Sequence, residues 1–328
     1  MSQLSEFQKT CDQELIMYLQ KKEGELSKVS AEASILIRII STFIQNGGKR
    51  IRPALYYFAS TSYGANKEEA LKLSLTFELF QTFCLIHDDI IDQSPLRRGQ
   101  QTVHIKHDIP TAILAGDMAL MLADEIFLAE YPSSSVKQIY NTFKQEVLLG
   151  EYLDTIFHQD ATTVMDLKTA RYTFMRPVEL GLQHAEVDQH IIDIWKSAMH
   201  DIGIAFQLKD DLMGVFGSED DMGKSPDSDL QEGKYTHLIE LFKRHASTSQ
   251  LEEFNTLFKK KELTHADCDN LRTMLREYDI PSVIQQEITQ SIQHTKKKLN
   301  AISHVVLHDV AEEILSFIQD MRMIKYSL

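Results

Sequence analysis

Three aspartates and two arginines stand close together in the stretch "LIHDDIIDQSPLRRG", residues 85–99. On a helix, residues four apart share a face, so Asp88 and Asp92 would present two carboxylates side by side. Two such charges at the end of an apolar run repel each other and lose hydration unless a cation binds them. Carboxylate oxygens suit Mg²⁺, so the pattern indicates a divalent metal site, although a solvated helix end would also explain a bare acidic motif.

Arg97 and Arg98 follow this acidic motif and favour the metal site. Mg²⁺ usually takes only one or two protein carboxylates and completes its coordination shell with substrate phosphates. A guanidinium group binds a phosphate through two parallel hydrogen bonds. Carboxylates followed by arginines therefore predict a site for a metal-bound polyphosphate.

A second acidic motif repeats this arrangement. The stretch "FQLKDDLMGVFG" places Asp210 and Asp211 after another apolar helical run, with Gln207 one turn earlier. Two cations, Lys224 and Lys234, lie in the polar stretch that follows. The second motif therefore offers the same combination of metal ligands and anion-binding groups.

Two smaller clusters add cations. The stretch "GGKRIRP" offers Lys49, Arg50 and Arg52 beside two glycines, without the spacing of a P-loop. Lys168 and Thr169 supply a further cation and a hydroxyl. Each cluster alone is weak, but together with the acidic motifs they predict two metal sites that face each other and two basic anion sites.

Helices must position these residues. Glycine and proline are scarce, with 13 and 7 in 328 residues, and apolar residues recur every three or four positions in residues 35–43, 73–91 and 284–292. Alternating strand patterns are nearly absent, so we expect an all-α fold. A loop is expected at "QSPLRRGQQT" and a turn at "YPSSS". The polar residues 217–236 form the one long loop, and a loop of that length is usually functional.

The composition excludes several classes of protein. The net charge of −14 argues against nucleic acid and against an anionic membrane surface. Three cysteines without CxxC spacing predict reduced thiols and a cytoplasmic protein. Neither a signal peptide nor a membrane-spanning run is expected.

The ordered set of motifs resembles the trans-isoprenyl diphosphate synthases, the all-α polyprenyl synthases. The motifs that carry the resemblance are "GGKRIRP", "LIHDDIIDQSPLRRGQQTVH", "GDMAL", "KTARYTF", "FQLKDDLMGVFG" and "GKSPDSDLQEGKYT". They cover nearly the whole chain in the family's order. The resemblance implies one domain over residues 1–328, a helical bundle with a central substrate cavity, several Mg²⁺ (or Mn²⁺) ions per active site, and a homodimer.

The reaction implied by the resemblance joins an allylic diphosphate (dimethylallyl, geranyl or farnesyl) head to tail with isopentenyl diphosphate. By resemblance, the metal ligands are Asp88, Asp92 and Asp210. The allylic diphosphate would be held by Arg97, Lys168, Lys224 and Lys234. Isopentenyl diphosphate would be held by Lys49, Arg52, Arg98 and Gln81. The oxygens turned toward the developing carbocation would be those of Thr169 and Gln207.

Four positions depart from the family pattern, and one of them, Gln101 in place of a common proline, is expected to matter little. Gln81 stands where a histidine is usual, and its amide can still donate a hydrogen bond. Glu151 replaces the glutamine of the GQxxD motif and is left out of the binding set. Gly214 replaces the last aspartate of the second acidic motif, a form that short-chain and archaeal-type members share.

Three residues that precede the first acidic motif in the same helix are expected to limit the length of the product. Cys84 lies one helical turn, ~5.4 Å, before Asp88, and Phe83 lies at that depth but turned to one side. Phe80 lies about two turns before Asp88, at ~12 Å. Ordinary core aromatics would give the same pattern. The position of Phe83 resembles geranylgeranyl diphosphate synthases of the archaeal type, so a C20 product is expected, with C15 farnesyl diphosphate as the alternative.

Two other functions fit parts of the pattern. A non-catalytic subunit of a prenyl synthase would usually lose an acidic motif, yet Asp88, Asp92 and Asp210 are all present. A terpene cyclase would need no second diphosphate site, so Lys49 and Arg52 argue against it.

Overall fold

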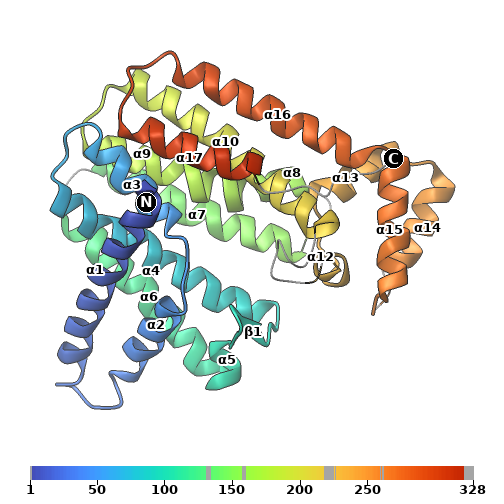
Figure 1. Cartoon of the computed structure of the whole chain (residues 1–328). Helices are drawn as coiled ribbons and strands as arrows, with labels where there is room; N and C mark the ends of the chain where they lie inside the picture. Colours follow the sequence, from blue (N-terminus) through green and yellow to red (C-terminus); the bar gives the residue numbers. More distant parts are fainter. Residues whose placement is uncertain are drawn as a thin grey trace. The chain divides into compact units, whose positions relative to one another are not determined.

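The computed structural model describes residues 2–130, 134–156, 160–217, 225, 227–258, 260 and 262–320, and most of them are helical (Figure 1). The prediction of an all-α fold is confirmed. The chain divides into two compact units that alternate along the sequence. Unit 1 comprises Met1–Tyr140, Pro177–Val187 and Val305–Val310, and unit 2 comprises Asn141–Arg176, Asp188–His304 and Ala311–Leu328.

Unit 1 contains most of the N-terminal half of the chain. Its elements are α1 (Gln3–Leu26), α2 (Ile35–Gln45), α3 (Ile51–Thr61), α4 (Lys67–Ile91), β1 (Leu96–Arg97), β2 (Gln100–Gln101), α5 (Val103–Lys106) and α6 (Ile109–Glu130), with most of α9 (Arg176–His184). Helix α4 begins where Asn66 accepts hydrogen bonds from two backbone amides of the first turn. It packs against α3 and α6 and buries Leu73, Phe77, Phe80 and Ile86.

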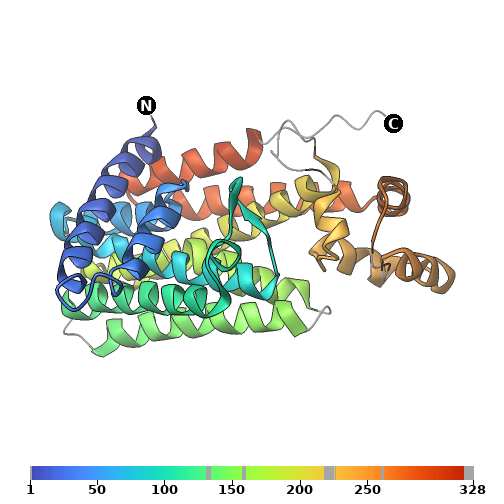
Figure 2. The same cartoon turned by 90° about the horizontal axis from the view of Figure 1, so that it is seen from below.

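The segment after α4 differs from the expected loop. Residues 96–101 form a two-stranded antiparallel hairpin in which Arg97 pairs with Gln100. The two residues at its turn, Arg98 and Gly99, have φ angles of 52° and 73°, as a tight hairpin turn requires. Figure 2 shows this connection from α4 through the hairpin to α5 in teal. The hairpin therefore fixes both arginines immediately after the first acidic motif.

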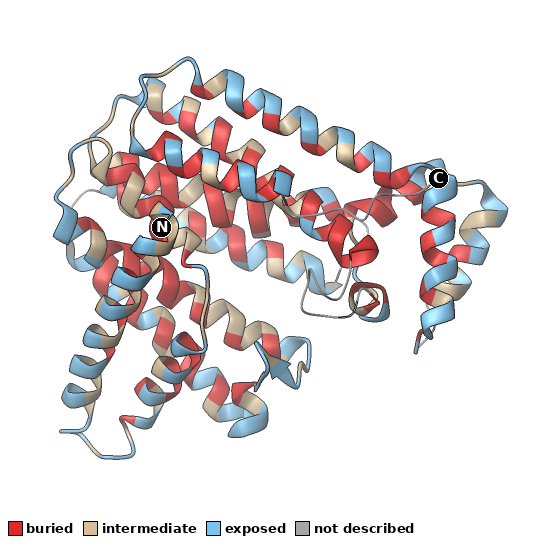
Figure 3. Cartoon of the chain, viewed as in Figure 1, coloured by how far each residue is buried: buried red, intermediate tan, exposed pale blue. Residues whose placement is uncertain are grey.

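Unit 2 contains the second acidic motif. Its elements are α8 (Ala161–Met165), η1 (Asp166–Met175), α10 (Gln189–Phe216), α12 (Ser228–Gln231), α13 (His237–His245), α14 (Thr248–Phe258), α15 (His265–Glu277) and α16 (Ile280–Leu299), with most of α7 (Ser134–Ile156) and α17 (Val306–Asp320). Helix α10 packs against η1 and α16. The predicted spacing in α16 is confirmed, because Ile284, Ile288 and Ile292 are buried along one face (Figure 3).

The predicted helix breaks are also confirmed. Helix α2 ends at Gln45, just before Gly47 and Gly48, and Pro53 lies in the first turn of α3. The turn expected at "YPSSS" lies partly outside the described residues, and α7 already begins at Ser134. No described helix is long and apolar enough to span a bilayer.

Candidate functional site

The first acidic motif occupies the last turn of α4. Asp88 is half-buried, Asp89 is 1% exposed, and Asp92 is an exposed residue at the C-terminus of the helix. Arg97 joins two of these groups, because its Nε donates to Asp89 Oδ1 at 2.8 Å and its Nη2 donates to Asp88 Oδ2 at 3.1 Å. A helix C-terminus carries partial negative charge, so three carboxylates there are unfavourable without cations.

The carboxylate of Asp89 remains incompletely satisfied. Burial raises its pKa, Arg97 opposes that shift, and the neighbouring charge of Asp88 adds to it. Its Oδ2 is buried and has no hydrogen-bond partner among the described residues. Because Asp89 is buried, it can orient Arg97 but is poorly accessible to a metal ion. The carboxylates of Asp88 and Asp92 are more accessible.

Residues 46–50 connect α2 to α3, and we call them the glycine-rich loop. This loop carries part of the predicted basic cluster of unit 1. Arg50 is buried and has a φ angle of 51°. Its Nε donates to Asp12 Oδ1 at 2.7 Å, its Nη2 donates to the Ile44 carbonyl at 2.6 Å, and its Nη1 donates to Glu78. Arg50 is therefore a structural cation that anchors the loop to α1 and α4.

This anchoring brings Arg98 to the loop. A Cβ on Gly48 would lie 2.5 Å from Arg50 Nη1 and 3.3 Å from Arg98 Nη2, so only glycine fits between the two guanidinium groups. Desolvation and the charges of Arg50 and Arg97 lower the pKa of Arg98, and Glu78 opposes them. Cations held this close together favour binding of an anion, and exposed Lys49 lies in the same loop.

The other predicted residues of unit 1 lie on α3 and α4. Arg52 and Gln81 are half-buried, on α3 and α4 respectively. The residues expected to limit chain length lie on α4, where Phe80 is 2% exposed while Phe83 and Cys84 are half-buried. The rings of Phe80 and Phe83 are 5.6 Å apart between centroids. Phe83 thus lies beside a core aromatic and keeps part of its own surface accessible.

Unit 2 brings five predicted residues to one cavity of about 250 Å³. These residues are Lys168, Thr169, Gln207, Asp210 and Lys234. Lys168 and Thr169 lie on η1, a π-helix, a form that occurs frequently at functional sites. Gln207 and Asp210 lie one turn apart on α10, with Asp210 exposed to solvent.

A chain of hydrogen bonds orients the uncharged groups of this cavity. Thr169 Oγ1 donates to Gln207 Oε1 at 2.6 Å, and Gln207 Nε2 donates to Asp211 Oδ1 at 2.7 Å. Burial raises the pKa of Asp211 to about 7, Gln207 and His237 oppose that shift, and the charges of Asp210 and Asp229 add to it. Asp211 therefore fixes the amide of Gln207, which turns an oxygen toward Thr169.

Sequence reasoning missed Asp229. This buried aspartate lines the same cavity and accepts a hydrogen bond from Lys234 Nζ at 3.1 Å. A Cβ on Gly214 would lie 1.8 Å from Asp229 Oδ2, so the glycine that replaces the last aspartate of the motif leaves room for this carboxylate. The aspartate in "SDLQEGK" was the available signal, but its position depends on a contact with Gly214 that the sequence does not show.

Lys168 is held by two carboxylates in unit 2. Its Nζ lies 2.6 Å from Asp154 Oδ2 and 2.9 Å from Glu151 Oε2. Burial alone would lower the pKa of Lys168, but Asp154 and Glu151 outweigh it and raise that pKa, so the ammonium stays charged. Glu151, left out of the binding set, thus orients a residue within it. Lys224, predicted to hold the allylic diphosphate, lies outside the described residues.

The donors of the two units suit Mg²⁺. The predicted ligands are carboxylate oxygens. In addition, Asp89 Oδ2, beside Asp88, and Thr236 Oγ1, in the unit 2 cavity, are buried oxygens with no hydrogen-bond partner in the described part of the chain. No group of three or more His, Cys, Asp or Glu side chains in the described ranges forms a closed metal cage. A cation bound through few protein ligands, with its shell completed by phosphate and water, fits this donor set.

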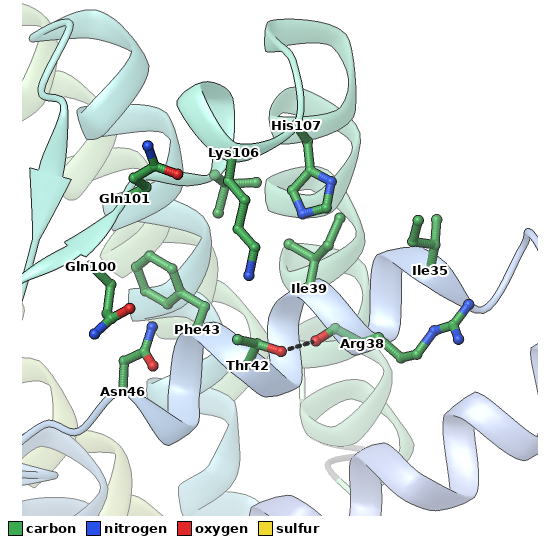
Figure 4. Close-up of a pocket in the computed structure, with 11 residues that line it drawn as sticks. Ile35, Arg38, Ile39, Thr42, Phe43, Asn46, Gln100, Gln101, Lys106 and His107 are labelled. Carbon is green, nitrogen blue, oxygen red and sulfur yellow. Dashed lines mark hydrogen bonds between the residues drawn. The ribbon is translucent and has the colours of Figure 1, made fainter.

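A separate cavity of about 300 Å³ lies in unit 1 beside the hairpin (Figure 4). Ile39 and Phe43 of α2 form its apolar part, and Lys106 points into it from α5. Of the predicted catalytic, metal and substrate-binding residues that the structure describes, none lines this cavity.

Comparison with known proteins gives one consistent result. The sequence pattern of the polyprenyl synthetase family matches residues 33–275. Geranylgeranyl diphosphate synthase from Sulfolobus acidocaldarius is 29% identical over 269 residues, which cover 77% of this chain and 81% of that one. Farnesyl diphosphate synthase from Micrococcus luteus is 30% identical over 275 residues, covering 77% and 91%.

Solved structures agree. Geranylgeranyl pyrophosphate synthase from Corynebacterium glutamicum, complexed with isoprenyl diphosphate and magnesium, superposes with a TM-score of 0.87 and 29% identity over 97% of this chain and 99% of that one. The all-α chain described above belongs to the polyprenyl synthetase family.

Proposed function

We propose that the protein is a Mg²⁺-dependent trans-prenyltransferase that makes geranylgeranyl diphosphate. The observation that carries this proposal is the cavity of unit 2. It combines a metal-type carboxylate (Asp210), two lysines (Lys168 and Lys234) and two oriented uncharged groups (Thr169 and Gln207). Such a set suits the loss of a diphosphate and the formation of a carbocation next to it.

In the proposed reaction, the bond between C1 of the allylic substrate and its diphosphate oxygen breaks. The double-bond electrons of isopentenyl diphosphate then form a carbon–carbon bond to C1, and a proton leaves the resulting cation to the departing diphosphate. Mg²⁺ held by Asp88, Asp92 and Asp210 would neutralise negative charge on that diphosphate.

The chain's own groups bind and orient the two substrates. Arg97, Lys168 and Lys234, with Lys224, hold the allylic diphosphate, so Arg97 and Lys168 must exchange carboxylate contacts for phosphate oxygens. The cations of the glycine-rich loop and its neighbours hold isopentenyl diphosphate, namely Lys49, Arg52 and Arg98 with the amide of Gln81. Thr169 and Gln207 stay in place through their hydrogen bonds and stabilise the carbocation without reacting with it.

Relatives of known product support the C20 assignment. The Sulfolobus acidocaldarius relative is a geranylgeranyl diphosphate synthase, and the half-buried Phe83 is the residue expected to limit the chain at that length. The Micrococcus luteus relative supports C15 farnesyl diphosphate as the second candidate.

Further parts of the proposal concern the whole chain. We infer a homodimer, which is supported by the large apolar side chains that α6 exposes, including Leu114, Met121 and Leu128. We infer a cytoplasmic location from the three free cysteines. The single domain over residues 1–328 stays a prediction.

A product assay tests the proposed function. The protein would be incubated with Mg²⁺, isopentenyl diphosphate and, in separate reactions, dimethylallyl, geranyl or farnesyl diphosphate, and the dephosphorylated alcohols would be identified by mass. A C20 alcohol is expected. A C15 end product would retain the reaction and reject the C20 assignment. The absence of condensation from all three starters, with diphosphate binding retained, would support a non-catalytic subunit, and cyclic hydrocarbons would indicate a cyclase.

A further inference from the structure

A second cavity of unit 2 is unrelated to the proposed reaction. It has a volume of about 480 Å³ and is formed by α10, α16 and α17. The residues that line it are Lys209, Gln285, Ile288, Thr289, Ile292, Gln293, Lys296, Ile318 and Gln319. A volume of this size matches that of small-molecule sites, about 300–1,000 Å³.

Lys209 is the unusual residue of this cavity. It is 3% exposed, and three isoleucines line the cavity with it. No hydrogen bond or ion pair joins its side chain to any residue that the structure describes. The buried part is the aliphatic stem, because Nζ keeps contact with the open space of the cavity. An ammonium group that is shielded from most of the bulk water is stabilised by an anion or by strong acceptors.

Other buried or half-buried cations of unit 2 do have partners. Arg272 Nη2 lies 2.5 Å from Asp227 Oδ1. Lys298 Nζ lies 2.5 Å from Asp201 Oδ2, on the same pair of helices, α16 and α10. Each of these two cations therefore contacts a carboxylate, whereas no carboxylate of the described residues contacts Lys209.

The remaining polar groups of the cavity can all donate hydrogen bonds, and most of them, including Lys296, are exposed to solvent. Lys296 adds a second ammonium group, and Gln285, Gln293 and Gln319 add amide groups. The described lining contains no aspartate or glutamate. Two ammonium groups and several amides around one space match an anion with a polar body, because phosphate accepts several charge-assisted hydrogen bonds at once.

We propose that this cavity is a binding site for a small organic phosphate, with the phosphate group against Lys209 and Lys296 and the polar remainder against the glutamine amides. Inorganic phosphate alone would fill only part of the space. The site is distinct from the proposed active site, since Asp210, the next residue of α10, lines the other cavity.

Binding measurements on the full chain test this proposal. Isothermal titration in EDTA would compare inorganic phosphate, ribose 5-phosphate and ribose. We expect ribose 5-phosphate to bind more tightly than inorganic phosphate and ribose not to bind. Lys209→Met should raise the dissociation constant for ribose 5-phosphate at least about tenfold, the effect of losing one charge-assisted hydrogen bond.

Two control variants locate the binding. Lys298→Met removes a lysine from the same helix pair but outside the cavity, and Lys168→Met removes one from the proposed active site. Both should keep the affinity of the wild type. Loss of binding in Lys168→Met with binding retained in Lys209→Met would place the phosphate in the proposed active site and overturn the inference. If inorganic phosphate binds and ribose 5-phosphate does not, the proposal that the ligand is an organic phosphate is overturned.

The fold of Lys209→Met is checked by thermal unfolding without phosphate. Met has a side chain of similar length and keeps the buried aliphatic contacts of Lys209, so the melting temperature should stay equal or rise. A marked fall in the melting temperature would mean that the chain itself satisfies Lys209, and that outcome would also overturn the proposal.

Discussion

Asp229 lies beside the second acidic motif in the space that Gly214 leaves open. Because a Cβ on residue 214 would lie 1.8 Å from Asp229 Oδ2, any larger side chain must displace that carboxylate or the helix. We expect Gly214→Ala to lower kcat by about 100-fold, as small displacements near the reacting groups do. Overpacking should also lower the free energy of unfolding by about 1–3 kcal/mol.

Gly24→Ala is the matched control for this substitution. Position 24 lies on α1, and a Cβ there would have no atom within 4 Å. The control should keep its kcat and gain about 0.5–1 kcal/mol of helix stability. Full activity of Gly214→Ala in the product assay would mean that the position of Asp229 does not matter to the reaction.

The same pair of residues shows where sequence reasoning stops. Acidic and basic motifs make Asp88, Asp210 and Lys168 candidate site residues because several short stretches of the sequence together indicate one chemistry. The contact of Gly214 with Asp229 joins positions 15 residues apart in different elements, and the pairing of Lys168 with Glu151 joins η1 to α7. Contacts of this kind depend on tertiary packing, which a single sequence does not encode in any local pattern.

At the scale of elements, the helices follow from periodicity but their irregular parts do not. Helices α2, α4 and α16 contain the residue runs whose spacing predicted them. The π-helix η1 and the hairpin at residues 96–101 were not predicted, because both depend on a change of backbone geometry within one or two residues. These two irregular elements carry Lys168, Thr169, Arg97 and Arg98, so the structure adds most where the candidate site lies.

Glu146 of α7 holds η1 in place. It accepts hydrogen bonds from Arg171 Nη1 at 2.8 Å and from Arg176 Nη2 at 2.6 Å. Burial alone would raise the pKa of Glu146, but Arg176 and Arg171 outweigh it and lower that pKa. A depressed carboxyl pKa stabilises the fold above the unfolded value, about 4.3, and the contribution disappears as the pH falls through the folded value.

The Glu146→Gln variant should be less stable than the wild type, by an amount that depends on pH. At pH 7 the variant should lose about 3 kcal/mol of unfolding free energy, because Arg171 and Arg176 lose the buried carboxylate that both contact. Arg171 keeps its ion pair with Asp166. The loss should shrink as the pH is lowered from 7 through the folded-state pKa of Glu146, because the wild-type carboxylate becomes protonated there and no longer carries the charge that the two arginines stabilise. Denaturant unfolding across this range measures the difference. Glu253→Gln, at an exposed position on α14, is the control and should unfold like the wild type at pH 7.

The face of α4 before the first acidic motif should set the product length. Phe83→Ala should lengthen the main product beyond C20 by one isoprene unit or more, because a half-buried ring is removed one turn before Asp88. Phe80→Ala removes a ring that is 2% exposed, so it should instead lower the free energy of unfolding by about 3–5 kcal/mol. An unchanged C20 product from a folded Phe83→Ala protein, sized by mass, would reject Phe83 as the limiting residue.

At the scale of the whole molecule, the question is whether both acidic motifs act on the same substrates. Asp88 and Asp92 belong to unit 1, and Asp210 belongs to unit 2. If all three bind metal ions on one diphosphate, as the family resemblance implies, then ligand binding must couple the two units. Hydrogen exchange with Mg²⁺ and inorganic diphosphate should therefore slow at residues 86–98 and at residues 207–214 together, and EDTA should reverse both changes.

The Asp88→Ala variant tests this coupling directly, because the substitution lies in unit 1 and the hydrogen exchange is measured in unit 2. Removal of the Asp88 carboxylate should abolish the protection of residues 207–214, while residues 248–277 of α14 and α15 should exchange as in the wild type throughout. Protection of residues 207–214 that persists in Asp88→Ala would show that the second motif binds the metal diphosphate alone. In that case the two motifs would bind independently, and the proposal that both hold the leaving diphosphate would fail even if Asp210 proved to be a metal ligand.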